Sequence, residues 1–132
     1  MAKGEPSKNQ YYYLRHPEGG GHLGDISSMT LSNVTHRRPL IAANWKMNKT
    51  SAETEVFIRA FLSNFPQGLG SDVVLCTPFT SLEKAHQLLN GTEVHLGAQN
   101  LNENKAGATT GEVSGAMLVA AGCRYVIIGH SE

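Results

Sequence analysis

The sequence predicts an α/β protein in which parallel strands alternate with helices. Apolar runs of strand length occur at residues 40–43, 72–76, 94–98 and 125–128, and continuous apolar runs are typical of strands buried on both faces. Helix signals lie between these runs, and the strands begin roughly 20 to 30 residues apart, which suits right-handed βαβ units. An open doubly wound sheet and part of a (β/α) barrel both fit this pattern.

Composition excludes several classes of protein. The chain has 132 residues, with 11 basic and 11 acidic residues and a formal net charge of zero, so nothing favours nucleic acid or an acidic membrane as a partner. No apolar run approaches the roughly 20 residues of a membrane helix. Cys76 and Cys123 lie far apart in apolar surroundings, so we expect buried thiols, no metal site and a reducing, cytoplasmic location.

Residues 1–36 differ from the rest of the chain. They contain three consecutive tyrosines at 11–13 and three glycines at 19–21, and no period of 2 or 3.6 residues persists. We therefore expect a disordered leader over 1–36, followed by one patterned domain over 37–132.

The first strand, over 40–43, leads into a helix that Thr50 and Glu53 begin as a capping box. The apolar stripe predicted for this helix consists of Val56, Phe57, Ala60 and Phe61. Pro66 and Gly68 mark the end of the helical region.

The second strand, over 72–76, is followed by a second predicted capping box at Thr80 and Glu83. The stripe of this helix is Leu82, Ala85, Leu88 and Leu89, and Asn90-Gly91 ends it. A weaker strand over 94–98 precedes a long polar loop over about 99–112, and loops of this length are usually functional. Ser114 then begins a short helix before the last strand.

Candidate chemistry lies where the first strand ends. Asn44 and Lys46 would project together if strand geometry continued, with Trp45 pointing the opposite way as a packing anchor. An ammonium beside an amide at the carboxyl end of a strand suits a phosphate or a developing oxyanion. The alternative is that Lys46 is an ordinary solvated lysine.

A histidine follows the last strand. His130 comes directly after Gly129, whose small size would let a ligand approach closely, and imidazole is a common general acid, base or electrophile. An ordinary loop histidine is the alternative. Glu132 would have a supporting role, either by pairing with Lys46 or as an acid or base. His95, inside the third strand, is expected to pack or to face the surface rather than to act in catalysis. Neither GxxxxGK[ST] nor a GxGxxG after the first strand occurs.

Four segments together resemble the triosephosphate isomerase family. They read NWKMN at 44–48, GAQN at 97–100, TGEVS at 110–114 and VIIGHSE at 126–132. Their order and spacing match the family over about 38–132. The resemblance implies the first four strands of a (β/α)8 barrel, with the site at the carboxyl ends of the strands.

The resemblance also implies an activity. The family interconverts dihydroxyacetone phosphate and glyceraldehyde 3-phosphate in glycolysis and gluconeogenesis, needs no cofactor and forms homodimers. Asn44 and Lys46 would bind substrate, and Lys46 would stabilise charge. His130 would act as a neutral electrophile, and the loop carrying Thr110 and Glu112 would reach into the partner subunit.

The 132 residues depart from the family because the general-base glutamate, the lid loop and the later phosphate-binding loops belong to later strands. We therefore expect the isolated chain to be inactive and a complementing C-terminal half to restore activity. The outer edges of the first and last strands should lie unpaired. A phosphate-binding or interaction module without catalysis, or an unrelated α/β phosphosugar protein, are the alternatives.

Overall fold

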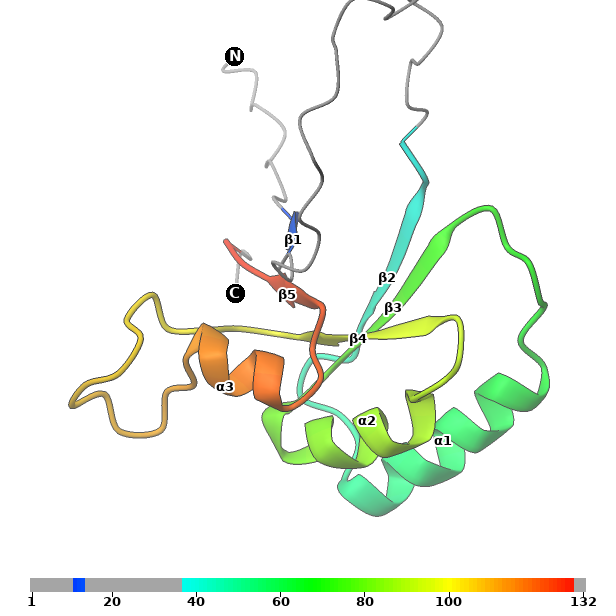
Figure 1. Ribbon diagram of the computed structural model, residues 1–132. Coiled ribbons are helices and arrows are strands. Elements are labelled where there is room, and N and C mark those ends of the chain that lie inside the picture. Colours follow the sequence, from blue (N-terminus) through cyan, green and yellow to red (C-terminus); the bar gives the residue numbers. More distant parts are fainter. Residues whose placement is uncertain (1–10, 14–36, 130–132) are drawn as a thin grey trace, which may run out of the picture.

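The computed structural model describes residues 11–13 and 37–129, which form one sheet and the helices packed on it (Figure 1). In chain order the elements are β1 (Tyr11–Tyr13), β2 (Leu40–Asn44), α1 (Ser51–Ser63), β3 (Asp72–Thr77), a 3-10 turn (Phe79–Ser81), α2 (Leu82–Leu89), β4 (Val94–Ala98), α3 (Gly115–Ala120) and β5 (Tyr125–Ile127). The four predicted strands are confirmed to within a residue at each end. Among these residues no helix is long and apolar enough to cross a membrane.

The strand order distinguishes the two folds that the sequence left open. The sheet runs β1-β5-β4-β3-β2, and β2 to β5 are parallel, each beside its neighbour in the chain. All three helices lie on one side of this curled sheet (Figure 1). A doubly wound sheet reverses its strand order and carries helices on both faces, so the arrangement is the first four strands of a (β/α) barrel, as predicted.

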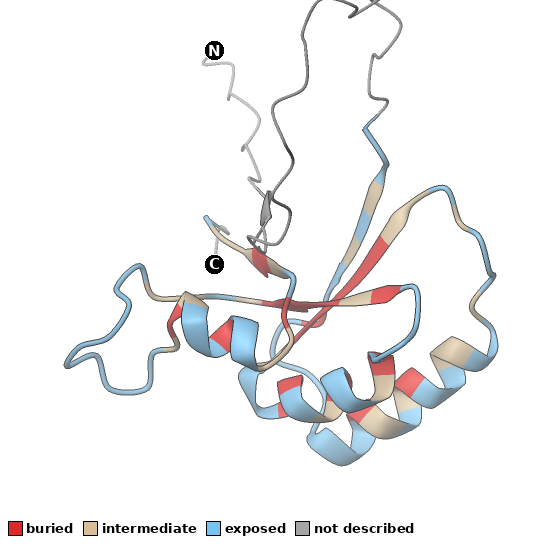
Figure 2. Ribbon diagram, in the orientation of Figure 1, coloured by how far each residue is buried: buried red, intermediate tan, exposed pale blue. Residues whose placement is uncertain are grey.

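The main core lies between the sheet and the helices. The strand residues of this core recur at every second position, because alternate residues of a strand point to the same face, and β3 and β4 also bury residues on the other face. Figure 2 shows this burial on β3, β4 and the inner sides of the helices, while the outer sides are exposed. The strand members are Val73, Leu75, Val94, Leu96, Ala98 and Val126, and the helical members are Ile58, Leu82, Ala85, Leu89 and Leu118.

Helix α1 begins as predicted but faces the core differently. The backbone N–H of Thr50 donates to Glu53 Oε2 at 2.8 Å, and the Glu53 N–H donates to Thr50 Oγ1 at 3.4 Å, which completes the capping box. The predicted stripe is wrong at Val56, which is 72% exposed, and at Ala60, which is also exposed. Thr54 and Ile58 are buried instead. The Thr54 hydroxyl donates to Thr50 O at 2.8 Å, so its burial leaves no unsatisfied donor.

Helix α2 buries three of its four predicted residues, with Leu88 partly buried, but it lacks the predicted capping box. Leu82, Ala85 and Leu89 are buried. A 3-10 turn precedes the helix, and the N-cap Ser81 makes no side-chain hydrogen bond to it. The Ser81 hydroxyl instead donates to Lys49 O at 3.4 Å, so a contact between distant segments replaces the local cap.

The outer edge of β5 is paired, contrary to expectation. Tyr11–Tyr13 run antiparallel to it, with Tyr12 opposite Val126. A bare edge presents unused backbone donors and acceptors, and tyrosine is among the residues that favour strands. The remainder of the predicted leader, 1–10 and 14–36, lies outside the described residues, so its disorder stays a prediction.

The face of the sheet that lies away from the helices is packed around a glycine. Gly97 is paired with Cys76 of β3 and Tyr125 of β5. A Cβ added at Gly97 would lie 2.7 Å from Cys76 Sγ and 2.9 Å from Val74 Cγ1. Val74 and Cys76 are buried there. Because Gly97 has no side chain, side chains of the two neighbouring strands, β3 and β5, can pack closely over β4.

Candidate functional site

The carboxyl ends of β2 to β5 meet at one edge of the sheet. The strand register places Asn44 beside Cys76, Thr77 beside Ala98, and Ala98 beside Val126. Segments that follow these ends therefore approach one another although they are far apart in the sequence. Functional side chains of (β/α) barrels occupy this edge, and the predicted residues Asn44 and Lys46 lie there.

The backbone leaves strand geometry immediately after Asn44. Lys46 adopts a left-handed conformation with φ of 53°, which is uncommon for residues other than glycine. Its N–H donates to Asn44 Oδ1 at 2.8 Å. This bond sets the orientation of the Asn44 carboxamide, whose nitrogen is the donor of the group. Asn44 and Lys46 are both exposed.

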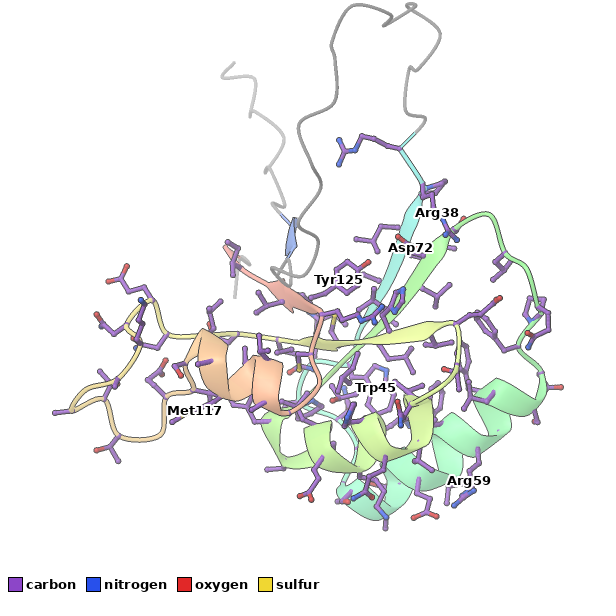
Figure 3. The ribbon with its side chains drawn as sticks, in the orientation of Figure 1. Arg38, Trp45, Arg59, Asp72, Met117 and Tyr125 are labelled. Atoms are coloured by element: carbon purple, nitrogen blue, oxygen red, sulfur yellow. The ribbon has the colours of Figure 1, made fainter. Side chains whose placement is uncertain are left out.

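Trp45 anchors this turn to the core, as predicted. It is 8% exposed, and its N–H donates to Cys76 O at 3.1 Å. Its ring meets Phe57 edge-on at 5.1 Å between centroids. Figure 3 shows Trp45 on the helix side of the sheet, away from Tyr125. The turn is therefore fixed on one face while Asn44 and Lys46 face solvent.

Lys49 and Gln99 also hold the turn, and sequence reasoning gave neither this role. Lys49 has φ of 71°, and its Nζ lies 5.7 Å from the Trp45 ring centroid and 4.9 Å from that of Phe57. Gln99 Nε2 donates to Lys46 O and to Cys76 O, each at 2.9 Å. The one feature of the sequence that could have indicated Gln99 is its position, as a polar residue directly after a predicted buried strand.

The end of β5 carries the second candidate group. Gly129 has φ of 64°, and a Cβ there would meet no atom within 4 Å. This left-handed conformation is a reason for glycine at this position, and the expected close approach of a ligand stays a prediction. His130 and Glu132 lie outside the described residues, so their predicted roles stay predictions.

The loop with Thr110 and Glu112 leaves the domain as an exposed excursion (Figure 1). All residues over 103–112 are exposed. Its base is closed where the Asn102 N–H donates to Val113 O at 2.8 Å, and Asn102 Nδ2 donates to Glu112 Oε2 at 3.4 Å. The role of Thr110 and Glu112 at a dimer interface stays a prediction.

Other titratable groups have environments that suit packing. Burial raises the pKa of the Cys76 thiol to about 11 and that of Cys123 to about 12, so neither is a ready thiolate at neutral pH. Burial lowers the pKa of His95, and the charge of Arg124 lowers it further. The His95 ring lies 5.7 Å from that of Tyr125, which agrees with its predicted packing role.

The described residues contain no group of three or more His, Cys, Asp or Glu side chains placed to hold a metal ion. What the edge does offer is the Lys46 cation and the Asn44 amide donor at the carboxyl end of β2. Cation and amide donors recognise phosphate oxygens and stabilise oxyanions. The arrangement is therefore suited to an anionic ligand.

Comparison with known proteins identifies relatives of this chain. The family model described as triosephosphate isomerase matches residues 39–132. A triosephosphate isomerase of Symbiobacterium thermophilum is 55% identical over 96 residues, which are 73% of this chain and 38% of that protein. One of Aquifex aeolicus is 55% identical over 95 residues, covering 72% and 38%.

A solved structure agrees with the sequence relatives. The crystal structure of triosephosphate isomerase from Bartonella henselae superposes with a TM-score of 0.63 at 41% identity, covering 72% of this chain and 38% of that one. The chain thus spans about 38% of the length of these relatives. The strand order, the NWKMN turn and the match over residues 39–132 agree, and the chain belongs to the triosephosphate isomerase family.

Proposed function

We propose that this chain supplies the substrate-holding part of a triosephosphate isomerase, which interconverts dihydroxyacetone phosphate and glyceraldehyde 3-phosphate. The observation that carries the proposal is the turn at 44–48, with its left-handed Lys46 and its Asn44 amide at the carboxyl end of β2. Family membership supplies the reaction. The pathway is glycolysis and gluconeogenesis, and the location is cytoplasmic.

In this proposal Lys46 and Asn44 bind the anionic substrate, and Lys46 stabilises the charge that develops on the substrate oxygen during enolisation. His130 acts as the neutral electrophile on the carbonyl, and Glu132 supports it. The loop with Thr110 and Glu112 contacts the partner subunit of a homodimer. No cofactor takes part, because the reaction only moves protons between carbon and oxygen atoms.

The 132 residues alone are expected to show no isomerisation above the buffer rate. The proton-abstracting glutamate of the family, its lid loop and its later phosphate-binding loops belong to later barrel strands, so the 132 residues alone lack the base and much of the substrate-binding surface. Mixing the chain with a second chain that carries the remaining four β/α units of a triosephosphate isomerase should produce activity. A coupled assay of glyceraldehyde 3-phosphate formation measures both.

Lys46→Ala in that mixture should lower kcat/KM by about 10² or more, because a preorganised cation at the developing charge is lost. Lys84→Ala is the matched control, since its ammonium pairs with Glu55 at 3.1 Å on the helix layer. Equal activity of the Lys46→Ala and unmodified mixtures would remove Lys46 from the site. Phosphate binding at Lys46 without isomerisation in the mixture would favour the binding-module alternative.

A further inference from the structure

We propose that Gln99 is a positioning residue that fixes the backbone of Lys46 in its left-handed conformation. The two residues are 53 positions apart, yet Gln99 Nε2 donates to Lys46 O at 2.9 Å. The consequence for ligand binding rests on the proposed function, whereas the backbone role stands on the geometry alone.

The left-handed conformation of Lys46 needs external support. With a Cβ present, this region of φ and ψ is unfavourable, and a residue remains there only where its surroundings determine it. Lys46 is held on both sides of its Cα. Its N–H donates to Asn44 Oδ1 at 2.8 Å, which restricts φ, and its carbonyl accepts from Gln99, which restricts ψ.

Gln99 is itself held firmly. It follows the end of β4 directly and is partly buried. Its Nε2 also donates to Cys76 O at 2.9 Å, and Cys76 O accepts from the Trp45 N–H at 3.1 Å. Both hydrogens of the carboxamide nitrogen are therefore used on backbone carbonyls. Neither N–H of this nitrogen is left to donate to a ligand, so Gln99 would affect ligand binding through Lys46.

Lys49 provides a comparison within the same turn. Among residues 37–129, Lys46 and Lys49 are the two residues other than glycine with positive φ, and the φ of Lys49 is 71°. Its anchors are different, because its Nζ lies over the Trp45 and Phe57 rings and its carbonyl accepts from Ser81 Oγ at 3.4 Å. A change at Gln99 should therefore release Lys46 and leave Lys49 in place.

The test is NMR of the isotope-labelled chain. A residue with positive φ has its amide proton unusually close to its own Hα, which gives a strong intraresidue cross-peak. We expect strong cross-peaks at Lys46 and Lys49 in the unmodified chain. Gln99→Glu keeps the size of the side chain but removes both donors, so the cross-peak should weaken at Lys46 alone.

Controls separate loss of the bond from other effects. Asn100→Asp makes the same amide-to-carboxylate change at the exposed neighbouring residue and should leave the Lys46 cross-peak unchanged. Gln99→Met removes the donors without adding charge. The unmodified chain gives a readout without mutation, since the side-chain amide protons of Gln99 should exchange with water more slowly than those of Asn100. An unchanged Lys46 cross-peak in the folded variants, or equal exchange at the two amides, overturns the proposal.

Titration with inorganic phosphate, followed at the Lys46 resonances, tests the link to the site. Gln99→Met should weaken phosphate binding about tenfold, because a displaced Lys46 would lose about one hydrogen bond to the charged phosphate. An unmodified chain that binds no phosphate would count against the proposed function, while the cross-peak would still decide the role of Gln99. Unchanged phosphate affinity together with a weakened cross-peak would overturn the link between Gln99 and the site.

Discussion

The hydroxyl of Thr77 is buried at the carboxyl end of β3 and has no hydrogen-bond partner within the part of the chain that the structure describes. Thr77 is 0% exposed. A buried hydroxyl without a partner costs about 1–3 kcal/mol, and an apolar group of the same shape avoids that cost. The hydroxyl of Thr54, equally buried, donates to Thr50 O at 2.8 Å. The two buried threonines therefore differ in whether the hydroxyl has a hydrogen-bond partner.

Thr77→Val should therefore raise the free energy of unfolding by about 1 kcal/mol, because valine has the same shape and no hydroxyl. Thr54→Val is the control and should lower it or leave it unchanged, since a satisfied hydrogen bond is removed. Urea denaturation of the two variants measures both changes. A loss of stability in Thr77→Val would show that its hydroxyl has a partner in solution.

At the scale of elements, Gly97 determines how closely β3 and β5 pack over β4. Gly97→Ala should lower the free energy of unfolding by about 1–3 kcal/mol, because the added methyl would overlap Cys76 Sγ and Val74 Cγ1. The neighbours are packed strand residues that have little room to move. Thermal and urea unfolding both measure the loss.

Gly115→Ala is the matched control for this substitution. Gly115 begins α3, and its added Cβ would meet Leu101 Cδ1 at 3.6 Å, an ordinary contact. Alanine also favours a helix over glycine by about 1 kcal/mol, so this variant should be as stable as the unmodified chain or more stable. Equal stability losses in the two variants would mean that the packing around Gly97 is not tight.

Elements with local signals were predictable from sequence. The α1 capping box needs only Thr50 and Glu53, three residues apart, and the apolar runs give the strands. The rotation of α1 was missed, because Thr54 is polar and its burial needs a hydroxyl bond to the preceding turn, although the buried Ile58 one turn later lies on the same face. Gln99 was missed because its bonds to Lys46 and Cys76 exist only after three strands are brought side by side.

At the scale of the whole molecule, β1 protects the sheet. The edge strands among the described residues are β1 and β2, and β1 covers β5. Tyr12→Pro removes a backbone donor and disfavours β pairing, which exposes the β5 edge to a second copy of the chain. We expect more self-association by sedimentation velocity, while Tyr12→Val, which keeps the donor, should behave as the unmodified chain. Equal association in both variants would contradict this.

The pairing of β1 with β5 also affects the kinetics of any later assembly. In a closed (β/α) barrel the fourth strand has a fifth parallel strand beside it, and here Tyr11–Tyr13 occupy that position with the opposite direction. An incoming strand can pair with β5 only by exchange, after β1 has left. Departure of β1 is a first-order step, so the rate of joining reaches a ceiling as the concentration of the incoming chain rises. Release of Tyr11–Tyr13 therefore sets the fastest rate at which a further strand can join the sheet at β5.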